Sequence, residues 1–385
     1  MSLPLPGPVA LNHSARLRTK IRRRIAAAGG WISFADFMEQ ALYAPGLGYY
    51  VAGAQKFGAA GDFVTAPELT PLFARALARQ AAEIMNMSAP CILEAGAGSG
   101  RLAVDLLRAL EVADALPECY EILELSPELA ARQRQTLARE IPRLLARVHW
   151  RESLPERFSG LALANEVLDA MPVHVVQWQD DAILEHGVAW GRDARFQWQT
   201  RPATGRLRAE AERIETECRL PPGYVSEISL LAPAWAATWG DRLEAGCLLL
   251  VDYGFPRHEF YHPDRDGGTL MCHYRHHAHS DPFHFPGLQD IGTHVDFTAL
   301  IAAAHPAGLA LSGYTHQARF LLNCGLLDDL AALETGGPAY LKNAAAAQKL
   351  LAPHEMGELF KVMALGKGIK TPLTGFTHGD KSHTL

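Results

Sequence analysis

The stretch from Cys91 to Leu107, which reads Cys-Ile-Leu-Glu-Ala-Gly-Ala-Gly-Ser-Gly-Arg-Leu-Ala-Val-Asp-Leu-Leu, decides the fold of this chain. Its first three residues are apolar and predict a short buried strand, while the apolar residues after Arg101 follow the spacing of a helix. Three glycines, Gly96, Gly98 and Gly100, separate these two parts. The stretch therefore predicts a strand, a glycine turn and a helix.

The glycine turn also predicts a ligand site. Because the bend lacks side chains, the sugar and amino-acid portions of a ligand can lie against bare backbone, where amides at the start of a helix are unpaired. Glu94 adds a carboxylate at the end of the strand. The dinucleotide fingerprint Gly-x-Gly-x-x-Gly fails, because Arg101 occupies the place of its third glycine. Glu-x-Gly-x-Gly-x-Gly instead resembles the motif of Rossmann-like S-adenosylmethionine enzymes, and a turn with a structural role alone is the alternative.

A second acidic residue falls where a nucleotide-type site needs one. The run from Tyr120 to Glu124 predicts a strand that ends in an acid, 26 residues after Gly98. In Rossmann-type sites an acid at this point binds the ribose hydroxyls. We therefore expect Glu124 to bind the ribose of the cofactor, and a solvated carboxylate is the alternative. Ser126 and Pro127 then predict the start of a helix.

Further polar residues follow a later strand. The apolar run from Leu161 to Ala164 predicts this strand, and Asn-Glu-Val-Leu-Asp-Ala-Met-Pro follows it directly. In an open parallel sheet, ligands bind outside the carboxyl ends of the strands. Asn165, Glu166 and Asp169 are therefore our catalytic candidates. The alternative is that Asn165 and Asp169 only bond the loop backbone, as turn residues do.

The N-terminal part predicts a helical arm and a covering loop. Arg16 to Ala28 and Ser33 to Tyr43 follow helical patterns, with Ser33 as the N-cap of the second helix. A stretch rich in glycine and aromatic residues follows, and we expect its residues Gly61 to Glu68 to cover the cofactor as a lid. Asp62 and Thr65 would supply polar groups to the cofactor there. An arm that only packs on the surface is the alternative.

Strands and helices alternate through most of the chain, which predicts an α/β fold with a doubly wound, mostly parallel sheet. The alternating residues of 173–199 predict an antiparallel meander inserted into it. We expect an N-terminal arm with its covering loop at residues 1–87 and a Rossmann-like domain at 88–365, with insertions at about 173–226 and 255–295. A polar, disordered tail is expected at 366–385.

Composition excludes several classes of protein. The chain has 385 residues, of which 48% are hydrophobic and 20% charged, and no apolar run reaches the roughly 18 to 20 residues of a membrane helix. The net charge of -6 predicts no attraction to nucleic acid. The six cysteines form no Cys-x-x-Cys pair, and the proline-rich N-terminus is unlike a secretion signal. We therefore expect a cytoplasmic protein without membrane insertion.

Histidines crowd the segment 269–286, at His273, His276, His277, His279 and His284. Such density could indicate a metal site. Metal ligands on one element keep fixed spacings with a carboxylate or cysteine nearby, whereas prolines interrupt this run. We expect a polar loop beside the cleft and no metal.

Taken in order, these motifs resemble those of the MidA family, roughly from residue 30 to residue 365. The motifs that carry the resemblance are Phe37 to Tyr50, Gly61 to Glu68, Glu94 to Gly100, Glu124 to Pro127, Asn165 to Pro172, Asp252 to Gly254, His294 to Phe297, Met356-Gly357 and Phe360 to Val362. Ala97 and Ser99 depart from the family at variable places where relatives often have proline and arginine, which leaves cofactor binding intact. The residues after Lys367 match nothing in the family pattern.

The resemblance implies a Rossmann-like class I methyltransferase that uses S-adenosyl-L-methionine. The best known family members are mitochondrial protein arginine methyltransferases that assist complex I assembly, so a protein substrate is implied, with a respiratory-complex subunit as the candidate. A guanidinium is cationic, and carboxylates can orient it through two parallel hydrogen bonds. Glu166 and Asp169 suit that task by their chemistry and position.

Two other functions stay open on the sequence alone. A nicotinamide oxidoreductase would share the sheet and Glu124, but it would need a glycine at position 101. A non-catalytic assembly chaperone could have the same fold and act by protein contact, because fold does not determine function. Methyl incorporation into a partner protein distinguishes an enzyme from such a chaperone.

Overall fold

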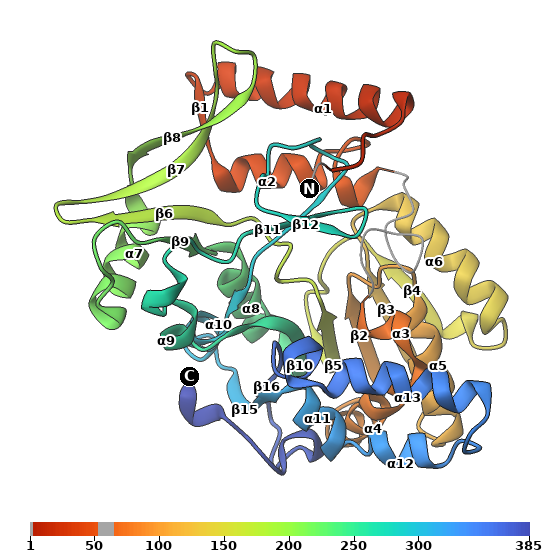
Figure 1. Ribbon diagram of the computed structural model, residues 1–385. Helices are drawn as coiled ribbons and strands as arrows, with labels where there is room; N and C mark the ends of the chain where they lie inside the picture. Colours follow the sequence, from red (N-terminus) through yellow and green to blue (C-terminus); the bar gives the residue numbers. More distant parts are fainter. Residues whose placement is uncertain (1–2, 53–64) are drawn as a thin grey trace. The chain divides into compact units, whose positions relative to one another are not determined.

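The computed structural model describes residues 3–52 and 65–385. The chain divides into two compact units, each assembled from separate segments (Figure 1). The sheet unit comprises Val64–Leu168, Pro233–Phe255 and Phe297–Leu385. The N-terminal unit comprises Met1–Phe63, Asp169–Ala232 and Pro256–Asp296.

The sheet unit contains a sheet with the strand order β15-β16-β10-β5-β2-β3-β4. Neighbouring strands from β10 to β4 run parallel, while β16 pairs antiparallel with both β10 and β15. The strands are β2 (Cys91–Ala95), β3 (Cys119–Leu123), β4 (Val148–Arg151), β5 (Phe158–Asn165), β10 (Leu243–Phe255), β15 (Ala310–His316) and β16 (Phe360–Lys367). This arrangement confirms the predicted doubly wound, mostly parallel sheet of the Rossmann-like class.

The strand order determines where a ligand can bind. From β2 the chain passes to β3 on one side of it, and β5 lies on its other side. The carboxyl ends of β2, β3 and β5 therefore meet at one edge, at the point where the strand order reverses, which is where open α/β sheets bind their ligands.

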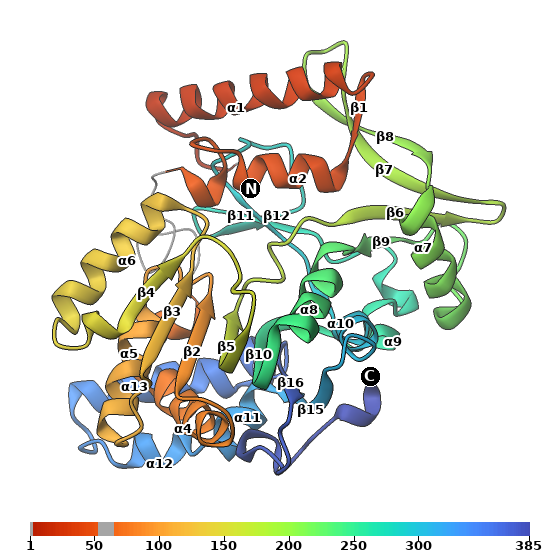
Figure 2. The same cartoon turned by 180° about the vertical axis from the view of Figure 1, so that it is seen from behind.

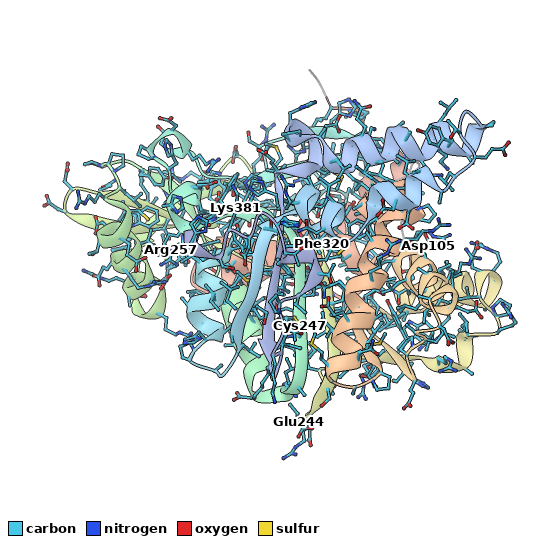
Figure 3. All side chains as sticks on the ribbon, turned by 90° about the horizontal axis from the view of Figure 1, so that it is seen from below. Asp105, Glu244, Cys247, Arg257, Phe320 and Lys381 are labelled. Carbon is cyan, nitrogen blue, oxygen red and sulfur yellow. The ribbon has the colours of Figure 1, made fainter. Side chains whose placement is uncertain are left out.

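Helices cover both faces of this sheet. Along β10, Cys247, Leu249 and Val251 belong to the core shared with α4 and α5, whereas Leu248 and Leu250, which alternate with them, are fully buried on the opposite face. Figure 2 shows α8 and α10 beside β10, and Figure 3 labels Cys247 in this strand. The helices are α3 (Ala66–Leu69), α4 (Pro71–Met87), α5 (Arg101–Val112), α6 (Pro127–Glu140), α8 (Leu231–Arg242), α10 (Phe297–Ala304), α11 (Gln317–Asn323), α12 (Leu326–Ala331) and α13 (Pro338–Leu351).

Local signals in the sequence explain where several helices begin. The Ser126 hydroxyl accepts a hydrogen bond from the Leu129 amide at 3.3 Å, and Pro127 occupies the first helical position of α6. In the N-terminal unit, the Ser33 hydroxyl accepts a hydrogen bond from the Asp36 amide at 3.0 Å. Both caps were predicted from the sequence, and the structure confirms them.

The C-terminal segment differs from the expectation of a disordered tail. Leu373 is fully buried, and Phe376 is buried against Phe320 of α11 (Figure 3) at a ring-centroid distance of 5.5 Å. The Gly375 amide also donates to Gln80 Oε1 at 2.8 Å. Two apolar residues in a polar stretch are enough to dock it, because Gly313 and Gly375 leave room for close aromatic packing.

The N-terminal unit joins segments that are distant in the sequence. Phe34 and Phe37 of α2 share one core with Val188 and Phe196 of the later antiparallel strands. The arm and the 173–226 insertion, which the sequence treats as separate parts, therefore form one unit. Its helices and strands are α1 (Pro8–Ala27), β1 (Trp31–Ser33), α2 (Phe34–Tyr43), β6 (His174–Gln179), β7 (Ala182–Trp190), β8 (Phe196–Pro202), α7 (Gly205–Cys218), β9 (Val225–Ile228), α9 (Arg257–Phe260), β11 (Met271–Tyr274), β12 (His277–His279), β13 (Asp290–Gly292) and β14 (Val295–Asp296).

The histidine-rich segment is more ordered than the polar loop that the sequence predicts. Strand β11 pairs antiparallel with both β12 and β13. Cys272 of β11 pairs with Ile291 of β13, and both are fully buried in the core of the N-terminal unit. The alternating apolar residues of β11 are buried and make it a strand. The surrounding histidines hide this strand pattern in the sequence.

Candidate functional site

The glycine turn after β2 requires glycine at three places. Gly96, Gly98 and Gly100 have φ values of +67°, +54° and +81°, in the left-handed region that other residues rarely adopt. A Cβ atom at Gly96 would lie 3.1 Å from Val167 Cγ2, and one at Gly100 would lie 2.9 Å from Leu137 Cδ1. At these three positions the turn is therefore bare backbone, held close to its neighbours at Gly96 and Gly100, as a ligand cradle needs.

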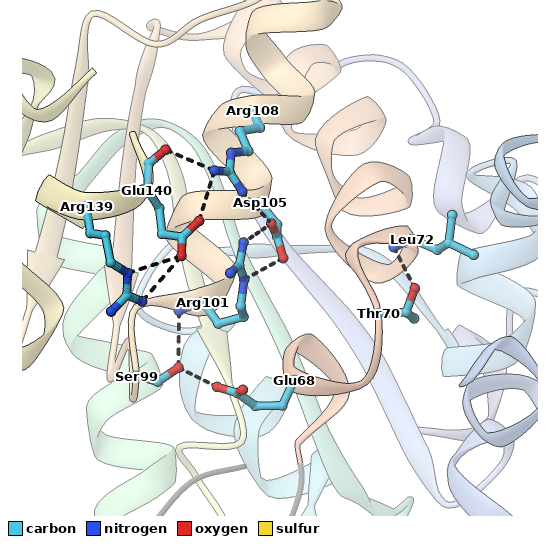
Figure 4. A network of polar contacts seen from close by, with 9 residues as sticks. All are labelled: Glu68, Thr70, Leu72, Ser99, Arg101, Asp105, Arg108, Arg139 and Glu140. Atoms are coloured by element: carbon cyan, nitrogen blue, oxygen red, sulfur yellow. Dashed lines mark hydrogen bonds and ion pairs between the residues drawn. The ribbon is translucent and has the colours of Figure 1, made fainter. Parts of the chain in front are cut away.

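A polar network ties this turn to the segment that precedes α4 (Figure 4). The Ser99 hydroxyl donates a hydrogen bond to the Glu68 carboxylate of α3 and accepts one from the Arg101 amide at 3.2 Å. The Arg101 side chain turns back along α5 and pairs with Asp105, with an Nε to Oδ2 distance of 2.8 Å. Ser99 thus connects the glycine turn to α3.

Glu94 is a buried acid at the end of β2. Its side chain is 2% exposed, and the Tyr120 hydroxyl donates a hydrogen bond to Glu94 Oε2 at 2.6 Å. Burial, with a smaller contribution from the neighbouring charge of Glu124, raises the pKa of Glu94 to about 7 against the lowering effect of the Tyr120 hydrogen bond. The residue therefore changes charge near neutral pH.

Glu124 directly follows β3, at the place that the sequence predicts. It is buried, and its two oxygens accept hydrogen bonds from the Ser126 amide and from the Gln133 side-chain amide, each at 2.9 Å. Such charge-assisted hydrogen bonds orient a carboxylate strongly. Its role toward the ribose stays a prediction.

Gln133 of α6 was missed by the sequence analysis. Its side-chain amide also donates to the Gly98 carbonyl at 3.1 Å, so that it bridges the glycine turn and Glu124. The signal was present: Leu129, Gln133 and Leu137 recur every fourth residue on the buried face of the helix. A glutamine at a core position of a helical pattern is a polar group that needs buried partners.

The turn after β5 has a strained backbone. Glu166 has a φ of +53°, and its amide donates to the Val251 carbonyl of β10 at 2.9 Å. Glu166 Oε1 accepts hydrogen bonds from the Ala66 amide at 3.3 Å and from Asn165 Nδ2 at 3.2 Å. Asn165 Oδ1 is buried and finds no donor among the described residues. Left-handed non-glycine residues cluster at functional sites, where the surrounding structure holds them.

Asp252 of β10 holds this turn in place. The residue is 1% exposed, and Asp252 Oδ2 accepts hydrogen bonds from the amides of Val167 at 3.1 Å and Leu168 at 2.9 Å. The sequence marked Asp252 only as part of the family resemblance. Its partners lie more than 80 residues earlier, and no local pattern reveals them.

The remaining predicted site residues fall in different parts of the chain. Thr65 is the N-cap residue of α3 in the sheet unit. Asp169 is buried and begins the second segment of the N-terminal unit, where its carbonyl accepts a hydrogen bond from the Thr293 amide at 3.0 Å. Asp62, together with Gly61 and Phe63 of the predicted lid, lies outside the described residues.

Two other kinds of site are absent from the described parts of the chain. Within residues 3–52 and 65–385, no three His, Cys, Asp or Glu side chains gather as a metal would require. None of the helices in these ranges is both long and apolar enough to cross a bilayer.

Comparison with curated proteins finds relatives along most of the chain. The protein arginine methyltransferase NDUFAF7 of Danio rerio is 27% identical, over 94% of this chain and 94% of that protein. The Drosophila melanogaster homologue is 28% identical over 94% of this chain and 88% of its own length. Both are named as mitochondrial proteins. The expectation of a cytoplasmic location, which rested on the composition of the chain and of its N-terminus, is therefore contradicted.

A solved structure and a family model identify the cofactor and the family. A "likely methyl transferase" from Burkholderia thailandensis, bound to S-adenosyl-homocysteine, is 49% identical over the whole of both chains, with a TM-score of 0.96. A family model described as "Putative S-adenosyl-L-methionine-dependent methyltransferase" matches residues 74–315. These residues contain the glycine turn, Glu124 and the turn after β5. The chain therefore belongs to this family of methyltransferases, and its cofactor is S-adenosyl-L-methionine.

Proposed function

We propose that this methyltransferase acts on an arginine side chain of a partner protein. The observation that carries the proposal is the similarity to relatives named protein arginine methyltransferase, which extends over most of both chains in the fish, fly and human proteins. The family resemblance makes a subunit of a respiratory complex the first acceptor to test.

The ends of β2 and β3 offer groups that fit S-adenosyl-L-methionine. In this proposal the bare backbone of Gly96, Gly98 and Gly100 receives its amino-acid and sugar portions, and Glu124 binds the ribose hydroxyls. Glu94 faces the cationic end of the cofactor, where a positive charge would favour the ionised carboxylate. The left-handed glycine backbone and the oriented Glu124 carboxylate support this assignment.

The segment before α4 is proposed to cover the cofactor, with Asp62 and Thr65 as its polar contacts. Two hydrogen bonds support this role. The Ala66 amide donates to Glu166, and the Glu68 carboxylate accepts from Ser99. The end of the segment is therefore tied both to the glycine turn and to the turn after β5.

Glu166, Asp169 and Asn165 are proposed to act on the acceptor. When bound, S-adenosyl-L-methionine supplies a methyl group on a cationic sulfur, and methylation of a guanidinium nitrogen releases one proton. Carboxylates can hold the guanidinium fork in one orientation and accept that proton. The buried acceptor oxygen of Asn165 and the strained backbone of Glu166 support a ligand-binding role for this turn.

The test separates cofactor binding from transfer. Glu166→Gln and Asp169→Asn are compared with Glu156→Gln, a control at an exposed site in the sheet unit. Affinity for S-adenosyl-homocysteine is measured by calorimetry, and methylation of purified respiratory-complex subunits by mass spectrometry. We expect cofactor affinity to stay within about threefold while transfer falls by at least about tenfold, the pattern of an interaction made with the reacting group.

Three other outcomes would each contradict a different part of the proposed function. Loss of cofactor affinity in both variants would place these acids in the cofactor pocket. Methyl groups found on a residue type other than arginine would overturn the acceptor class. If both variants supported assembly of the partner complex as well as the parent does, contact rather than transfer would be the function, as in the chaperone alternative.

A further inference from the structure

The side chain of Gln133 is a fully buried polar group whose donors both point at the proposed cofactor site. It is 0% exposed on α6, and its Nε2 donates to the Gly98 carbonyl at 3.1 Å and to Glu124 Oε2 at 2.9 Å. Burying an amide costs free energy unless its hydrogen bonds are made. Here they join the turn after β2 to the acid after β3, adding a side-chain link beside the backbone hydrogen bond from the Gly96 amide to the Leu123 carbonyl at 3.0 Å.

Trp150 of β4 determines which way this amide points. Its indole Nε1 donates to Gln133 Oε1 at 3.0 Å. An indole nitrogen can only donate, so it selects the oxygen end of the amide and directs the NH2 end toward Gly98 and Glu124. Rotating the amide by half a turn would place its oxygen against two acceptors and its NH2 against a donor. The Trp150 hydrogen bond therefore excludes the rotated state.

The result is a carboxylate that is oriented from two sides. Glu124 Oε1 accepts from the Ser126 amide and Oε2 accepts from Gln133. An ionised carboxylate has about four lone-pair directions, and hydrogen bonds to both of its oxygens fix its orientation. A group that binds two ribose hydroxyls gains most from such preorganisation, because the ordering is complete before the ligand arrives.

We propose that Gln133, oriented by Trp150, is a positioning residue for the cofactor: it sets the Glu124 carboxylate and the Gly98 carbonyl in the arrangement that recognises the ribose. The inference rests on the proposed role of Glu124 in binding the ribose hydroxyls. It assigns Gln133 no contact with the reacting atoms.

The test uses two ligands that differ only at the ribose, S-adenosyl-homocysteine and its 2′-deoxy analogue. Gln133→Leu removes both donors and keeps a similar volume, and Gln135→Leu, at an exposed site of the same helix, is the control. Calorimetry should show that the parent and the control prefer the ribose ligand by about tenfold or more. In Gln133→Leu we expect this preference to fall below about threefold.

Trp150→Phe provides a second variant that keeps Gln133 in place, and near-UV circular dichroism checks that each variant is folded. We expect Trp150→Phe to lower the ribose preference in part, and to add nothing when combined with Gln133→Leu, because both changes act through one amide. Equal loss of affinity for the two ligands in Gln133→Leu would overturn the proposal, since a packing defect does not distinguish a hydroxyl from a hydrogen.

Glu124→Ala, which removes the acceptor oxygens, separates failure of this inference from failure of the proposed cofactor site. If Glu124→Ala keeps the full ribose preference, then Glu124 does not bind the ribose and both ideas are wrong. If Glu124→Ala removes the preference while Gln133→Leu keeps it, the role of Glu124 holds and Gln133 is only a buried structural residue.

Discussion

Replacing Glu94 by glutamine should make the protein more stable at pH 8 and change its stability little at pH 5. Glutamine keeps an oxygen that can accept the Tyr120 hydroxyl, which lies 2.6 Å from Glu94 Oε2 in the structure. It also removes the negative charge of the ionised carboxylate, whose burial is unfavourable. The variant therefore isolates the free energy of keeping an ionised carboxylate at a site that is 2% exposed.

The pKa of Glu94 gives the size and the sign of the effect. Burial raises it from 4.5 to about 7 in the folded chain. The folded protein therefore holds a proton that the unfolded chain has already lost, and the free energy of unfolding falls as pH rises from about 4.5 to about 7. Since one pKa unit corresponds to about 1.4 kcal/mol, the full effect is about 3 kcal/mol.

Urea titrations followed by circular dichroism at pH 5, 6, 7 and 8, without cofactor, measure this directly. We expect the gain in unfolding free energy of Glu94→Gln to grow across this range to about 3 kcal/mol, while exposed Glu156→Gln shows no such growth. The gain should come with weaker binding of S-adenosyl-homocysteine at pH 8, because the carboxylate is proposed to serve the cofactor. A stability difference that is the same at pH 5 and pH 8 would refute the reasoning.

Three further changes test other parts of the structure. Gly98→Val should weaken S-adenosyl-homocysteine binding by at least about tenfold, because valine is strained at a φ of +54° and fills the cradle, whereas Gly308→Val, with a φ of +95° at a site away from the turn, should leave affinity unchanged in calorimetry. Asp252→Ala should cost about 1 to 3 kcal/mol in urea unfolding, since the amides of Val167, Leu168 and Tyr253 lose their acceptor, and unchanged stability would mean that the turn does not depend on it. Phe376→Ala should cost about 3 to 5 kcal/mol, and a cost near zero would contradict docking of the C-terminal segment.

Much of the fold could be predicted because its signals are local. Three glycines in five residues predict the glycine turn, and all three have the left-handed backbone that only glycine adopts easily. Ser33 and Ser126 cap helices through amides three residues away. The antiparallel meander of β6, β7 and β8 was predicted from the alternating apolar and polar residues of 173–199, a run with breaks at 180–181 and 191–193.

The candidate site was only partly predictable. Glu124 and Glu166 were found because each directly follows a strand whose end is visible in the sequence. Asp252 and Gln133 were not assigned a role, because their partners are supplied by other strands and turns. The docked C-terminal segment was missed for a similar reason: Leu373 and Phe376 carry no periodicity, and only the pocket that receives them makes them core residues.

The sequence by itself determined the strand–turn–helix unit at Cys91 to Leu107, the α/β class and, through short motifs in a fixed order, the family. These depend on backbone conformations and periodicities that a few neighbouring residues set. Only the tertiary structure decided that Gln133 bridges Gly98 and Glu124, that Asp252 supports the turn at Glu166, and that the arm shares a core with the 173–226 insertion. The physical reason is that a buried polar or apolar group is stabilised by whatever the fold places beside it, and that neighbour can come from anywhere in the chain.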